Sequence, residues 1–492
     1  MSTNYDVAIV GYGPVGATLV NVLGQFGLRT IAFDKEVEIY NLPRAVHFDD
    51  ETMRIFQFAG VADALREVVR VNPGMKFVDD DGNLLLDWPR PGGTTEQGWN
   101  SSFRFHQPDL ERILRSQAGQ LPNADLCLGH EVIGIEQDKS KVDITVMKLA
   151  DGEQMKIRAK FIVGCDGARS FVRKHMGSSL EDLGFHERWL VTDILLKHPR
   201  PDLGDYSIQY CSKSQPATYV RCPQNRRRWE MALQDDCLDF DPADESAVWR
   251  KLKRWITPED GTLERSAVYE FRSAVAKKWR NGRMFLAGDA AHQMPPFMGQ
   301  GMCAGIRDAI NLGWKLATSC KNDFSEELLD SYEQERSPHV RTYIEMAVKL
   351  GKLINTSDTK GALKAAFPQA DGTTRLKSPA LRLEAGPGVL PDQWGGFLSP
   401  QLMLDGSNHG DNVIGGAACL LVRRRTDELV SKFSSFSGKI VSPEDNSSVG
   451  AYLDKLAAQA LLIRPDRYLF GGAEAVDHVP DLLDSWHRFL AG

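Results

Sequence analysis

The feature that most constrains the fold is a glycine pattern, G-x-G-x-x-G, near the start of the chain. Gly11, Gly13 and Gly16 follow the apolar run DVAIVG and open the helical stretch YGPVGATLVNVLGQFG, after which RTIAFD is typical of a second strand. In such a βαβ unit the first glycine permits a tight turn, the second lets a pyrophosphate approach, and the third allows close helix–strand packing. The pattern predicts a dinucleotide at the helix N-terminus.

An acidic residue follows at the position where this kind of site needs one. Asp34 ends the second predicted strand, 18 residues after Gly16. A carboxylate there accepts hydrogen bonds from ribose hydroxyls, and its charge disfavours a 2′-phosphate. The pattern does not distinguish NAD from FAD.

Composition excludes several classes of protein. The 492 residues are 42% hydrophobic and 25% charged, with a net charge of −7, so neither nucleic acid nor an anionic membrane surface is expected as a partner. No apolar run is long enough to span a bilayer, and the N-terminus enters a strand too early for a signal peptide. The eight cysteines include no C-x-x-C pair, which argues against a metal site, dithiol chemistry and a disulfide framework. We therefore expect a cytoplasmic protein.

The pattern of predicted elements indicates an α/β protein with an insertion and an appendage. Short alternating runs between about Glu187 and Glu270 are typical of an antiparallel sheet with one solvated face. Helical spacing returns at 304–317 and again in EELLDSYEQERSPHVRTYIEMAVKLGKLI, where Pro338 predicts a break or a kink. We predict a discontinuous nucleotide-binding domain (1–75, 101–186 and 271–355), a sheet domain (76–100 and 187–270), a linker (356–395) and a small α/β domain (396–492).

Two further motifs follow predicted strands. FIVGCDG ends on Asp166 and Gly167, and RMFLA leads into Gly288 and Asp289, followed by PPFMGQGM. Taken alone, either aspartate could simply cap a helix. Three such motifs in this order on one chain are far less expected by chance.

With these motifs, the chain resembles the single-component FAD-dependent aromatic hydroxylases of the para-hydroxybenzoate hydroxylase fold, over roughly residues 4–350. The stretches LPRAVHFDDETMRIFQFAG and QPDLERIL are most similar to the 3-(3-hydroxyphenyl)propionate hydroxylase branch. The resemblance implies a Rossmann-like FAD-binding domain, an inserted antiparallel substrate sheet and a C-terminal thioredoxin-like α/β domain. Without a C-x-x-C pair, that last domain cannot act as a dithiol catalyst.

The resemblance also implies roles in binding FAD without a covalent link. Asp34 would hold the adenosine ribose, and Arg44 and Gln107 would reach the FAD phosphates or ribityl chain. Asp289 would accept from a ribityl hydroxyl, and Asp166 would support the region where the cofactor and nicotinamide domains meet. Arg44 in a surface salt bridge and Gln107 as a helix N-terminal residue are the alternatives. The full expected set is Gly11, Gly13, Pro14, Val15, Gly16, Asp34, Lys35, Arg44, Gln107, Val132, Asp166, Gly288, Asp289, Pro296, Gly299, Gln300, Gly301 and Met302.

The loop after Asp289 would form a wall at the flavin. Pro295 and Pro296 fix φ and lack N–H donors, which suits a rigid surface at the reactive edge. Residues Gly299–Gly301 permit close backbone contact with the pyrimidine ring, and the following helix N-terminus would stabilise negative charge there. His292 is interpreted as a packed or hydrogen-bonded residue.

The implied reaction uses NAD(P)H to reduce FAD and O2 to form a C4a-hydroperoxide, which hydroxylates a phenol, most simply a small phenolic acid. No residue is singled out as the base that deprotonates the substrate. The catalytic candidates are Pro296, His47, Tyr210 and Tyr219, and the candidates for the substrate pocket are Tyr210, Tyr219, Arg221, Trp229 and Met231. Since only alternate strand residues face one side, about half of such a set should be plain sheet surface.

Other interpretations stay open at this point. The run Arg226–Arg228 predicts a solvated hairpin turn, although one arginine facing inward would favour a carboxylate-bearing substrate. The same fold could oxygenate a larger polycyclic substrate, or serve as a flavin-binding redox sensor without turnover. A flavin halogenase is disfavoured because the W-x-W-x-I-P signature is missing. The sequence does not determine the oligomeric state, and a homodimer is one assembly that it allows.

Overall fold

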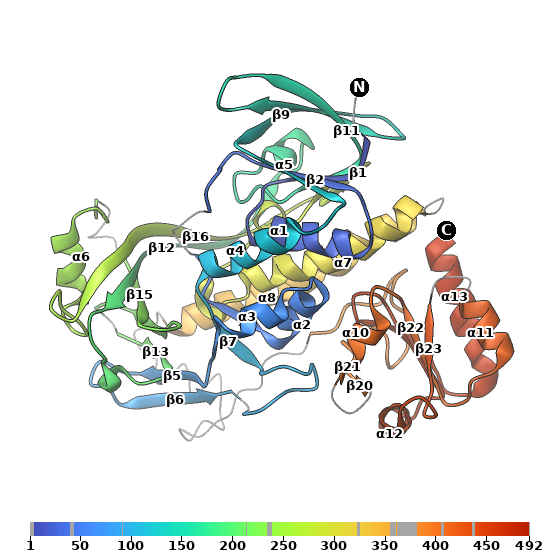
Figure 1. Ribbon diagram of the computed structural model, residues 1–492. Helices are drawn as coiled ribbons and strands as arrows, with labels where there is room; N and C mark the ends of the chain where they lie inside the picture. Colours follow the sequence, from blue (N-terminus) through green and yellow to red (C-terminus); the bar gives the residue numbers. More distant parts are fainter. Residues whose placement is uncertain are drawn as a thin grey trace.

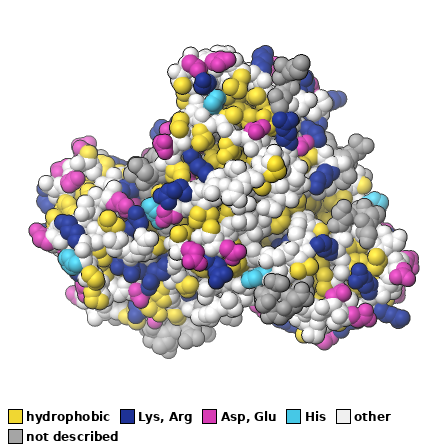
Figure 2. Space-filling model, viewed as in Figure 1, with side chains coloured by type: hydrophobic (Ala, Val, Ile, Leu, Met, Phe, Trp, Pro, Cys, Tyr) yellow, Lys and Arg dark blue, Asp and Glu magenta, His cyan; other side chains and the backbone are white. Residues whose placement is uncertain are grey.

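The computed structural model describes residues 4–39, 44–90, 92–212, 214–233, 239–321, 325–354, 361, 381–404, 408–434 and 438–491. Figure 1 shows a central body with the N-terminal sheet at its top, an antiparallel sheet to its left and the C-terminal residues to its right. Positive and negative side chains are interspersed over the face seen in Figure 2. No helix of the described residues is both long enough and apolar enough to cross a bilayer.

The N-terminal sheet is built on parallel strands buried on both sides. In spatial order its strands are β17 (Arg280–Asn281), β18 (Met284–Leu286), β11 (Gln154–Gly164), β1 (Asn4–Val10), β2 (Thr30–Asp34) and β8 (Ala124–Leu128). Strands β18, β11, β1, β2 and β8 pair in parallel. The buried apolar runs in β1, β2, β18 and the end of β11 are typical of parallel strands covered on both faces. An antiparallel extension on β11 adds β10 (Val142–Lys148) and β9 (His130–Gln137).

Helices cover this sheet and connect it to the rest of the molecule. Helix α1 (Pro14–Gln25) packs between α4 (Gln107–Ala118) and α7 (Gly301–Lys321). Helix α8 (Glu326–Ile354) follows α7 and continues through Pro338 as one helix, so the expected break is not found. Shorter elements lie at the edges, namely α2 (Asp50–Phe58), α3 (Ala62–Arg66), α5 (Phe171–His175) and a small sheet of β3 (His47–Asp49), β7 (Ser102–Arg104) and β4 (Arg70–Val71).

A second sheet stands beside the first and is entered through two long strands. Its order is β19 (His292–Gln293), β16 (Gly261–Ala276), β12 (Leu180–Leu196), β15 (Arg226–Ala232), β14 (Ala217–Arg221), β13 (Ser207–Tyr210), β5 (Gly74–Val78) and β6 (Leu84–Pro89). Neighbouring strands of this sheet pair antiparallel, apart from β13 with β5, which pair in parallel. Helix α6 (Glu245–Leu252) packs on the face turned away from the centre of the molecule.

That outer face accounts for the aromatic residues of these strands. Tyr219, Trp229 and Met231 are almost fully buried against Val248 and Leu252 of α6. Tyr210 packs in the same cluster and lies against the Trp255 ring at 5.1 Å, while Arg221 donates to the backbone oxygens of Cys222 and Gln224. Four of the five candidates for the substrate pocket thus pack in the cluster under α6, and the neighbouring residues Gln209, Thr218 and Glu230 line the cavity instead.

The arginine run does not form a solvated turn. Residues 226–228 begin strand β15, and the Arg228 side chain is 1% exposed. Its Nε and Nη2 atoms donate to the two carboxylate oxygens of Asp193 at 2.7 and 2.9 Å, and its Nη1 donates to the backbone oxygen of Arg44 at 2.8 Å. Arg228 is thus paired with Asp193 inside the sheet, and its hydrogen bond to Arg44 connects the sheet to the N-terminal region.

The C-terminal residues fold into a small α/β unit. Its four-stranded sheet has the order β23 (Lys439–Val441), β22 (Cys419–Val422), β24 (Ala460–Ile463) and β25 (Leu469–Ala473), with β22 and β23 parallel. One face packs under α11 (Asp427–Ser434) and α13 (Val479–Ala491), the other under α10 (Gly410–Ile414) and α12 (Ser447–Lys455). A hairpin of β20 (Met403–Leu404) and β21 (Asn408–His409) precedes it. The arrangement agrees with the expected thioredoxin-like domain.

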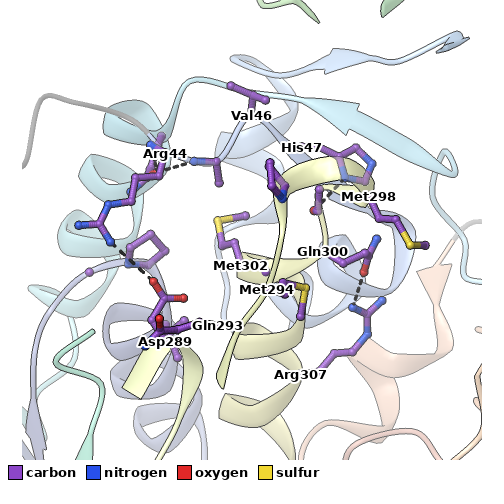
Figure 3. Close-up of a pocket in the computed structure, with 18 of the residues that line it drawn as sticks. Arg44, Val46, His47, Asp289, Gln293, Met294, Met298, Gln300, Met302 and Arg307 are labelled. Carbon is purple, nitrogen blue, oxygen red and sulfur yellow. Dashed lines mark hydrogen bonds and ion pairs between the residues drawn. The ribbon is translucent and has the colours of Figure 1, made fainter. Parts of the chain in front are cut away.

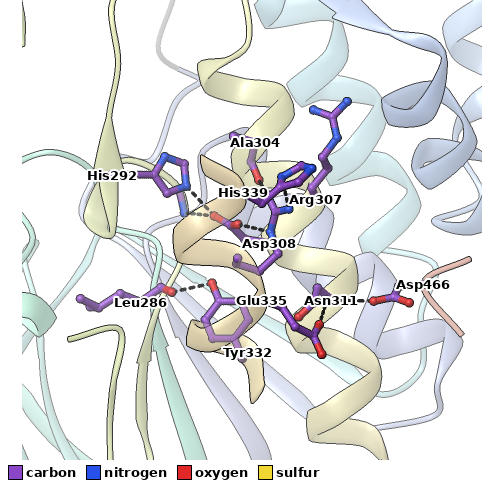
Figure 4. Close-up of polar contacts among 12 residues, drawn as sticks. Leu286, His292, Ala304, Arg307, Asp308, Asn311, Tyr332, Glu335, His339 and Asp466 are labelled. Carbon is purple, nitrogen blue, oxygen red and sulfur yellow. Dashed lines mark hydrogen bonds and ion pairs between the residues drawn. The ribbon is translucent and has the colours of Figure 1, made fainter. Parts of the chain in front are cut away.

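Buried charges join this unit to the central body. Arg464 makes ion pairs with Glu335 of α8 and with Asp466, and Asn311 of α7 donates to both of these carboxylates at 2.8 and 2.9 Å (Figure 4). Leu383, Val389 and Trp394 lie in the second part of the predicted linker, yet all three are buried. Residues 381–395 therefore belong to the packed structure, whereas the greater part of residues 356–380 lies outside the described residues.

Candidate active site

A single large cavity connects the three sequence motifs. Its volume is about 1570 Å³, well above the roughly 300–1,000 Å³ of a site for one small ligand. It runs from the glycine turn after β1, past Asp289 and the Pro295–Met302 loop, to the inner face of the antiparallel sheet. Tyr468 and Leu398 of the C-terminal part close one side. The cavity is large enough for a dinucleotide and a second molecule together.

The glycine turn fits close contact with a phosphate group. Gly11 has φ of +94°, and a Cβ there would lie 2.5 Å from the backbone oxygen of Cys165. A Cβ on Gly16 would lie 2.0 Å from the oxygen of Gly11, whereas one on Gly13 would meet open space. Gly13 is also the N-cap of α1 and provides no side chain to cap it. The first N–H groups of α1 are therefore left available to an anion in the cavity.

Polar groups continue along this side of the cavity. Asp34 accepts hydrogen bonds from the backbone N–H groups of Tyr12 at 2.7 Å and Glu36 at 2.9 Å. Gln107 accepts from the backbone N–H of Arg44 at 2.9 Å and donates to Glu111 at 2.8 Å, so its amide holds the Arg44 segment in place. Lys35 and Val132 also line the cavity here.

The strand-end aspartates have different partners. Asp289 lies in a 3-10 turn, Gly288–Ala290, and its carboxylate is 3.6 Å from Arg44 Nη1 (Figure 3). Asp166 instead accepts from Ser170 Oγ and from the backbone N–H of Phe171 and Val172, which caps α5. Burial raises the pKa of Asp166. Both aspartates line the cavity, but only the carboxylate of Asp289 is about half exposed in it.

Gly288 itself is held by the interior of the protein. Its N–H donates to Asp308 Oδ2 at 3.0 Å, and the same oxygen accepts from His292 Nε2 at 2.7 Å (Figure 4). Burial alone would raise the pKa of Asp308, but the charges of His292 and Arg336 hold it at about 2. The hydrogen bond agrees with the interpretation of His292 as a packed residue.

The loop after the prolines turns sharply and leads into α7. Gly299 has φ of +63° and ends the short 3-10 turn Pro296–Met298. The Gln300 side chain points toward Arg307, and its Oε1 accepts a hydrogen bond from Arg307 Nη1 at 3.0 Å (Figure 3). Its Nε2 donates to Asp49 Oδ2 at 3.1 Å. Helix α7 begins at the next residue.

His47 contacts the backbone of this loop through its imidazole ring. Its Nδ1 lies 3.2 Å from the backbone oxygen of Gly299, and its Nε2 lies 2.8 Å from Ser102 Oγ. Since Asn72 also donates to Ser102 Oγ at 2.9 Å, the hydroxyl proton points to Nε2 and the Nδ1 proton to Gly299. Burial, with the nearby charges of Arg104 and Arg90, lowers the pKa of His47 to about 3. His47 is therefore neutral, with both nitrogens occupied.

The inner face of the antiparallel sheet carries polar residues that sequence reasoning missed. Gln209, Thr218 and Glu230 line the cavity from β13, β14 and β15. Arg104 of β7 reaches the same region and donates to Ser207 Oγ at 2.8 Å. The sequence could have indicated these three residues, because each is the direct neighbour of a residue that was assigned to the pocket and therefore points to the opposite face of its strand.

The chain is similar in sequence to a known protein family and to proteins named hydroxylases. Residues 4–347 match the family model described as "FAD binding domain". The chain is also 35% identical to a "Probable NADH-specific resorcinol 4-hydroxylase" of Rhodococcus jostii (strain RHA1), over 95% of this chain and 91% of that protein. The chain belongs to the FAD-dependent aromatic hydroxylase family.

Two further likenesses agree with membership of this hydroxylase family. A "3-(3-hydroxy-phenyl)propionate/3-hydroxycinnamic acid hydroxylase" of Mycolicibacterium gilvum (strain PYR-GCK) is 36% identical over 73% of this chain, which spans 62% of that protein's length. The crystal structure of the flavin-dependent monooxygenase PieE, in complex with FAD and substrate, superposes with a TM-score of 0.84 at 21% identity and covers 99% of both chains. At that identity the superposition establishes the fold alone.

The residues present fit FAD, the cofactor of this hydroxylase family. A phosphate fits the open N-terminus of α1 at Gly13, where a Cβ would meet no atom within 4 Å, and Asp34 lies at the end of β2 beside it. Most residues that the sequence assigned to FAD line the one cavity, namely Gly11, Gly13, Pro14, Val15, Asp34, Lys35, Arg44, Gln107, Val132, Asp166, Asp289, Pro296, Gly299, Gln300, Gly301 and Met302. Gly16 and Gly288 do not line it: a Cβ on Gly16 would meet the Gly11 backbone, and one on Gly288 would meet the Val15 side chain.

Proposed function

We propose that this chain is a single-component monooxygenase that uses NAD(P)H and O2 to hydroxylate a small phenolic compound. The overall change is NAD(P)H + H⁺ + O2 + Ar–H giving NAD(P)⁺ + H2O + Ar–OH. The names of two relatives support the substrate class, since one refers to resorcinol and the other to a hydroxyphenyl propionate. The first of these names also supports NADH as the reductant.

The observation that carries this proposal is the continuity of the cavity. The surfaces that fit the cofactor and the polar face of the antiparallel sheet belong to one enclosure. A substrate bound on the sheet would therefore share one cavity with the cofactor. Exclusion of water matters because a reactive oxygen species in a wet site is lost without product.

Bound FAD would supply the redox chemistry: it takes a hydride from NAD(P)H and activates O2 to deliver an OH equivalent. The chain provides placement and electrostatics. Gly13 and the start of α1 would bind the pyrophosphate, Asp34 the ribose, and Asp289 a ribityl hydroxyl. The start of α7 would stabilise negative charge on the reduced ring, and His47 would hold the Gly299 carbonyl in place.

A cation in the substrate part of the cavity supports a substrate with an anionic oxygen. In the part of the chain that the structure describes, no carboxylate lies within ion-pair distance of the Arg104 guanidinium. Burial lowers its pKa to about 10, so the group is still charged at neutral pH. A phenolate or carboxylate oxygen beside Arg104 would compensate that buried charge. This favours phenols and phenolic acids over neutral polycyclic substrates.

NADH and NADPH consumption tests the proposal. The purified holoenzyme is mixed with each nucleotide, with and without resorcinol and 3-(3-hydroxyphenyl)propionate, and the product is identified by mass spectrometry. We expect substrate-stimulated oxidation with a product heavier by one oxygen atom, and little hydrogen peroxide. Stoichiometric flavin binding without turnover of any phenol would contradict the proposal and favour a redox sensor. Turnover of polycyclic phenols alone would favour the larger-substrate alternative.

A further inference from the structure

The cavity face of the antiparallel sheet carries one ordered row of polar side chains. Gln209 pairs with Thr218 across β13 and β14, and Thr218 pairs with Glu230 across β14 and β15. Directly paired residues in a sheet project to the same side, so the three side chains stand next to one another. Thr218 Oγ1 donates to Gln209 Oε1 at 2.7 Å. Glu230 is the ionisable member of the row.

The contacts of Glu230 differ from those of the other buried carboxylates nearby. Its nearest cation is Arg228, with Nη1 at 3.7 Å, but that guanidinium is already bound to Asp193 at 2.7 and 2.9 Å. Among the described residues no donor lies within hydrogen-bond distance of the Glu230 carboxylate, although the side chain is only 13% exposed. A buried carboxylate facing a cavity without a donor is suited to accept a proton from a ligand.

The charges around Glu230 come from four elements. Arg228 lies on its own strand, Asp193 on β12, Arg104 on β7 and Arg265 on β16. Burial and the charge of Asp193 raise the pKa of Glu230, while the three arginines oppose that rise. A raised carboxylate pKa brings a general base closer to the pKa of its substrate, which makes proton transfer more effective.

Other ionisable groups of the cavity are less suited to this step. Both nitrogens of His47 are occupied. Asp49 is bound to Arg307 at 2.6 Å, and this charge keeps its pKa low although burial would raise it. Asp50 accepts from Thr95 Oγ1 at 2.6 Å and from the backbone N–H of Glu51 at 3.0 Å. Burial and the charge of Asp49 raise the pKa of Asp50 to about 6, which makes Asp50 the principal rival.

We propose that Glu230 is the base that deprotonates the phenolic substrate, an assignment that rests on the proposed function. The phenol O–H bond breaks, the proton binds a carboxylate oxygen of Glu230, and the negative charge stays on the substrate oxygen, where the Arg104 guanidinium stabilises it. The proton is returned to the oxygen of the product after hydroxylation. Gln209 and Thr218 complete the polar row beside this oxygen.

The first test follows the proton without turnover. Oxidised holoenzyme, without NAD(P)H, is mixed with resorcinol or with its more acidic 2-fluoro derivative in weakly buffered solution containing a pH indicator. Wild type should form the bound phenolate, seen as a change in ultraviolet absorbance, with little proton release, because Glu230 keeps the proton. In Glu230→Gln the phenol should either stay neutral or ionise with release of about one proton per site.

The second test uses turnover. Glu230→Gln should lower kcat for resorcinol on the order of 100-fold, with a smaller change in KM. The loss should shrink for 2-fluororesorcinol and as the pH rises from about 6 to about 9, since an ionised substrate needs no base. Glu264→Gln is the matched control, because Glu264 pairs with Arg226 away from the cavity.

The outcomes separate this inference from the proposed function. Unchanged kcat in Glu230→Gln, together with bound phenolate that still forms without proton release, would overturn the role of Glu230 while leaving hydroxylation intact. The same effects in Asp50→Asn, with Glu230→Gln like wild type, would assign the step to Asp50. If wild type hydroxylates no phenol, the proposed function itself fails and this inference with it.

Discussion

The hydroxyl of Tyr468, in the C-terminal part, donates a hydrogen bond of 2.7 Å to Glu51 of α2. Glu51 also accepts from Arg307 Nε at 2.5 Å, and Arg307 donates to the Gln300 side chain at 3.0 Å. A continuous set of hydrogen bonds thus runs from the C-terminal domain to the loop that faces the cofactor site. Because Arg307 also binds Asp49 at 2.6 Å, the position of the loop depends on several buried ion pairs.

Removing the first hydrogen bond of this set should loosen the loop. We expect Tyr468→Phe to lower the free energy of unfolding by about 1 kcal/mol, the typical net value of one hydrogen bond, and to speed the release of FAD. Denaturant unfolding and the fluorescence of released flavin measure the two effects. Tyr452→Phe in α12 is the matched control, since Tyr452 lies in the same domain but outside this set. Equal flavin release in both variants would contradict the coupling.

Two glycines of the first turn should respond differently to alanine. Gly11→Ala places a Cβ 2.5 Å from the Cys165 oxygen at a positive φ, so we expect a destabilised fold and little soluble protein. Gly13→Ala meets no atom within 4 Å and has an ordinary φ of −72°, so its apoprotein should keep the wild-type Tm. Its added methyl group should nevertheless weaken FAD binding about tenfold or more, because it occupies space needed by the phosphate. Soluble yield measures the first effect, and flavin titration of the wild-type and Gly13→Ala apoproteins measures the second; wild-type affinity in Gly13→Ala would contradict the assignment.

Asp289→Ala should weaken FAD retention. The Asp289 carboxylate is about half exposed in the cavity and lies opposite Arg44, so its removal takes away an acceptor without opening the core. We expect faster loss of flavin on gel filtration and lower activity that added FAD restores in part. Asp151→Ala, which removes an exposed carboxylate paired with Lys148, is the control. A variant that stays fully loaded and equally active would refute this role.

Acid should weaken the contact between the C-terminal domain and α2. Burial alone would raise the pKa of Asp411, but the charges of Arg467 and Arg54 hold it at about 2, below the ordinary 3.8. A carboxyl group with a lowered pKa in the folded state contributes stability above about pH 4, and this contribution disappears as the pH falls toward 2. It amounts to about 2 to 3 kcal/mol.

Denaturant unfolding at about pH 6 and about pH 3 measures this contribution. Asp411→Asn should be less stable than wild type at the higher pH, because Arg54 and Arg467 lose their partner. It should then lose less stability than wild type on acidification. Parallel losses in the two proteins would show that Asp411 does not titrate in this range.

The local motifs allowed the nucleotide-binding half to be predicted from the sequence. The turn at Gly11–Gly16 follows from backbone sterics, which neighbouring residues determine, and the order of the motifs identified the family. Long-range pairing could not be found in this way. The ion pair between Arg54 and Asp411 joins residues 357 positions apart. In the sequence, each of them looks like an ordinary charged residue on the exposed face of a helix.

The error in the substrate pocket has a simple physical origin. Trp229 and Met231 are candidates for the pocket because they lie on strands of the inserted sheet, whereas in the structure they pack against α6 on the other face of that sheet. An alternating strand shows which residues share a face but not which face meets the cavity. That information comes from α6, since the helix covers one side and leaves Gln209, Thr218 and Glu230 on the other.

This division of the strands also bears on how the enzyme's substrate range could change. Residues that pack under α6 and residues that line the cavity alternate along β13, β14 and β15, so the two sets occupy separate faces. Mutations at Gln209 or Thr218 can therefore alter which ring is accepted with little effect on the apolar layer under α6. Such a sheet could be adapted to new aromatic compounds by a few single substitutions, each of them tolerated by the fold.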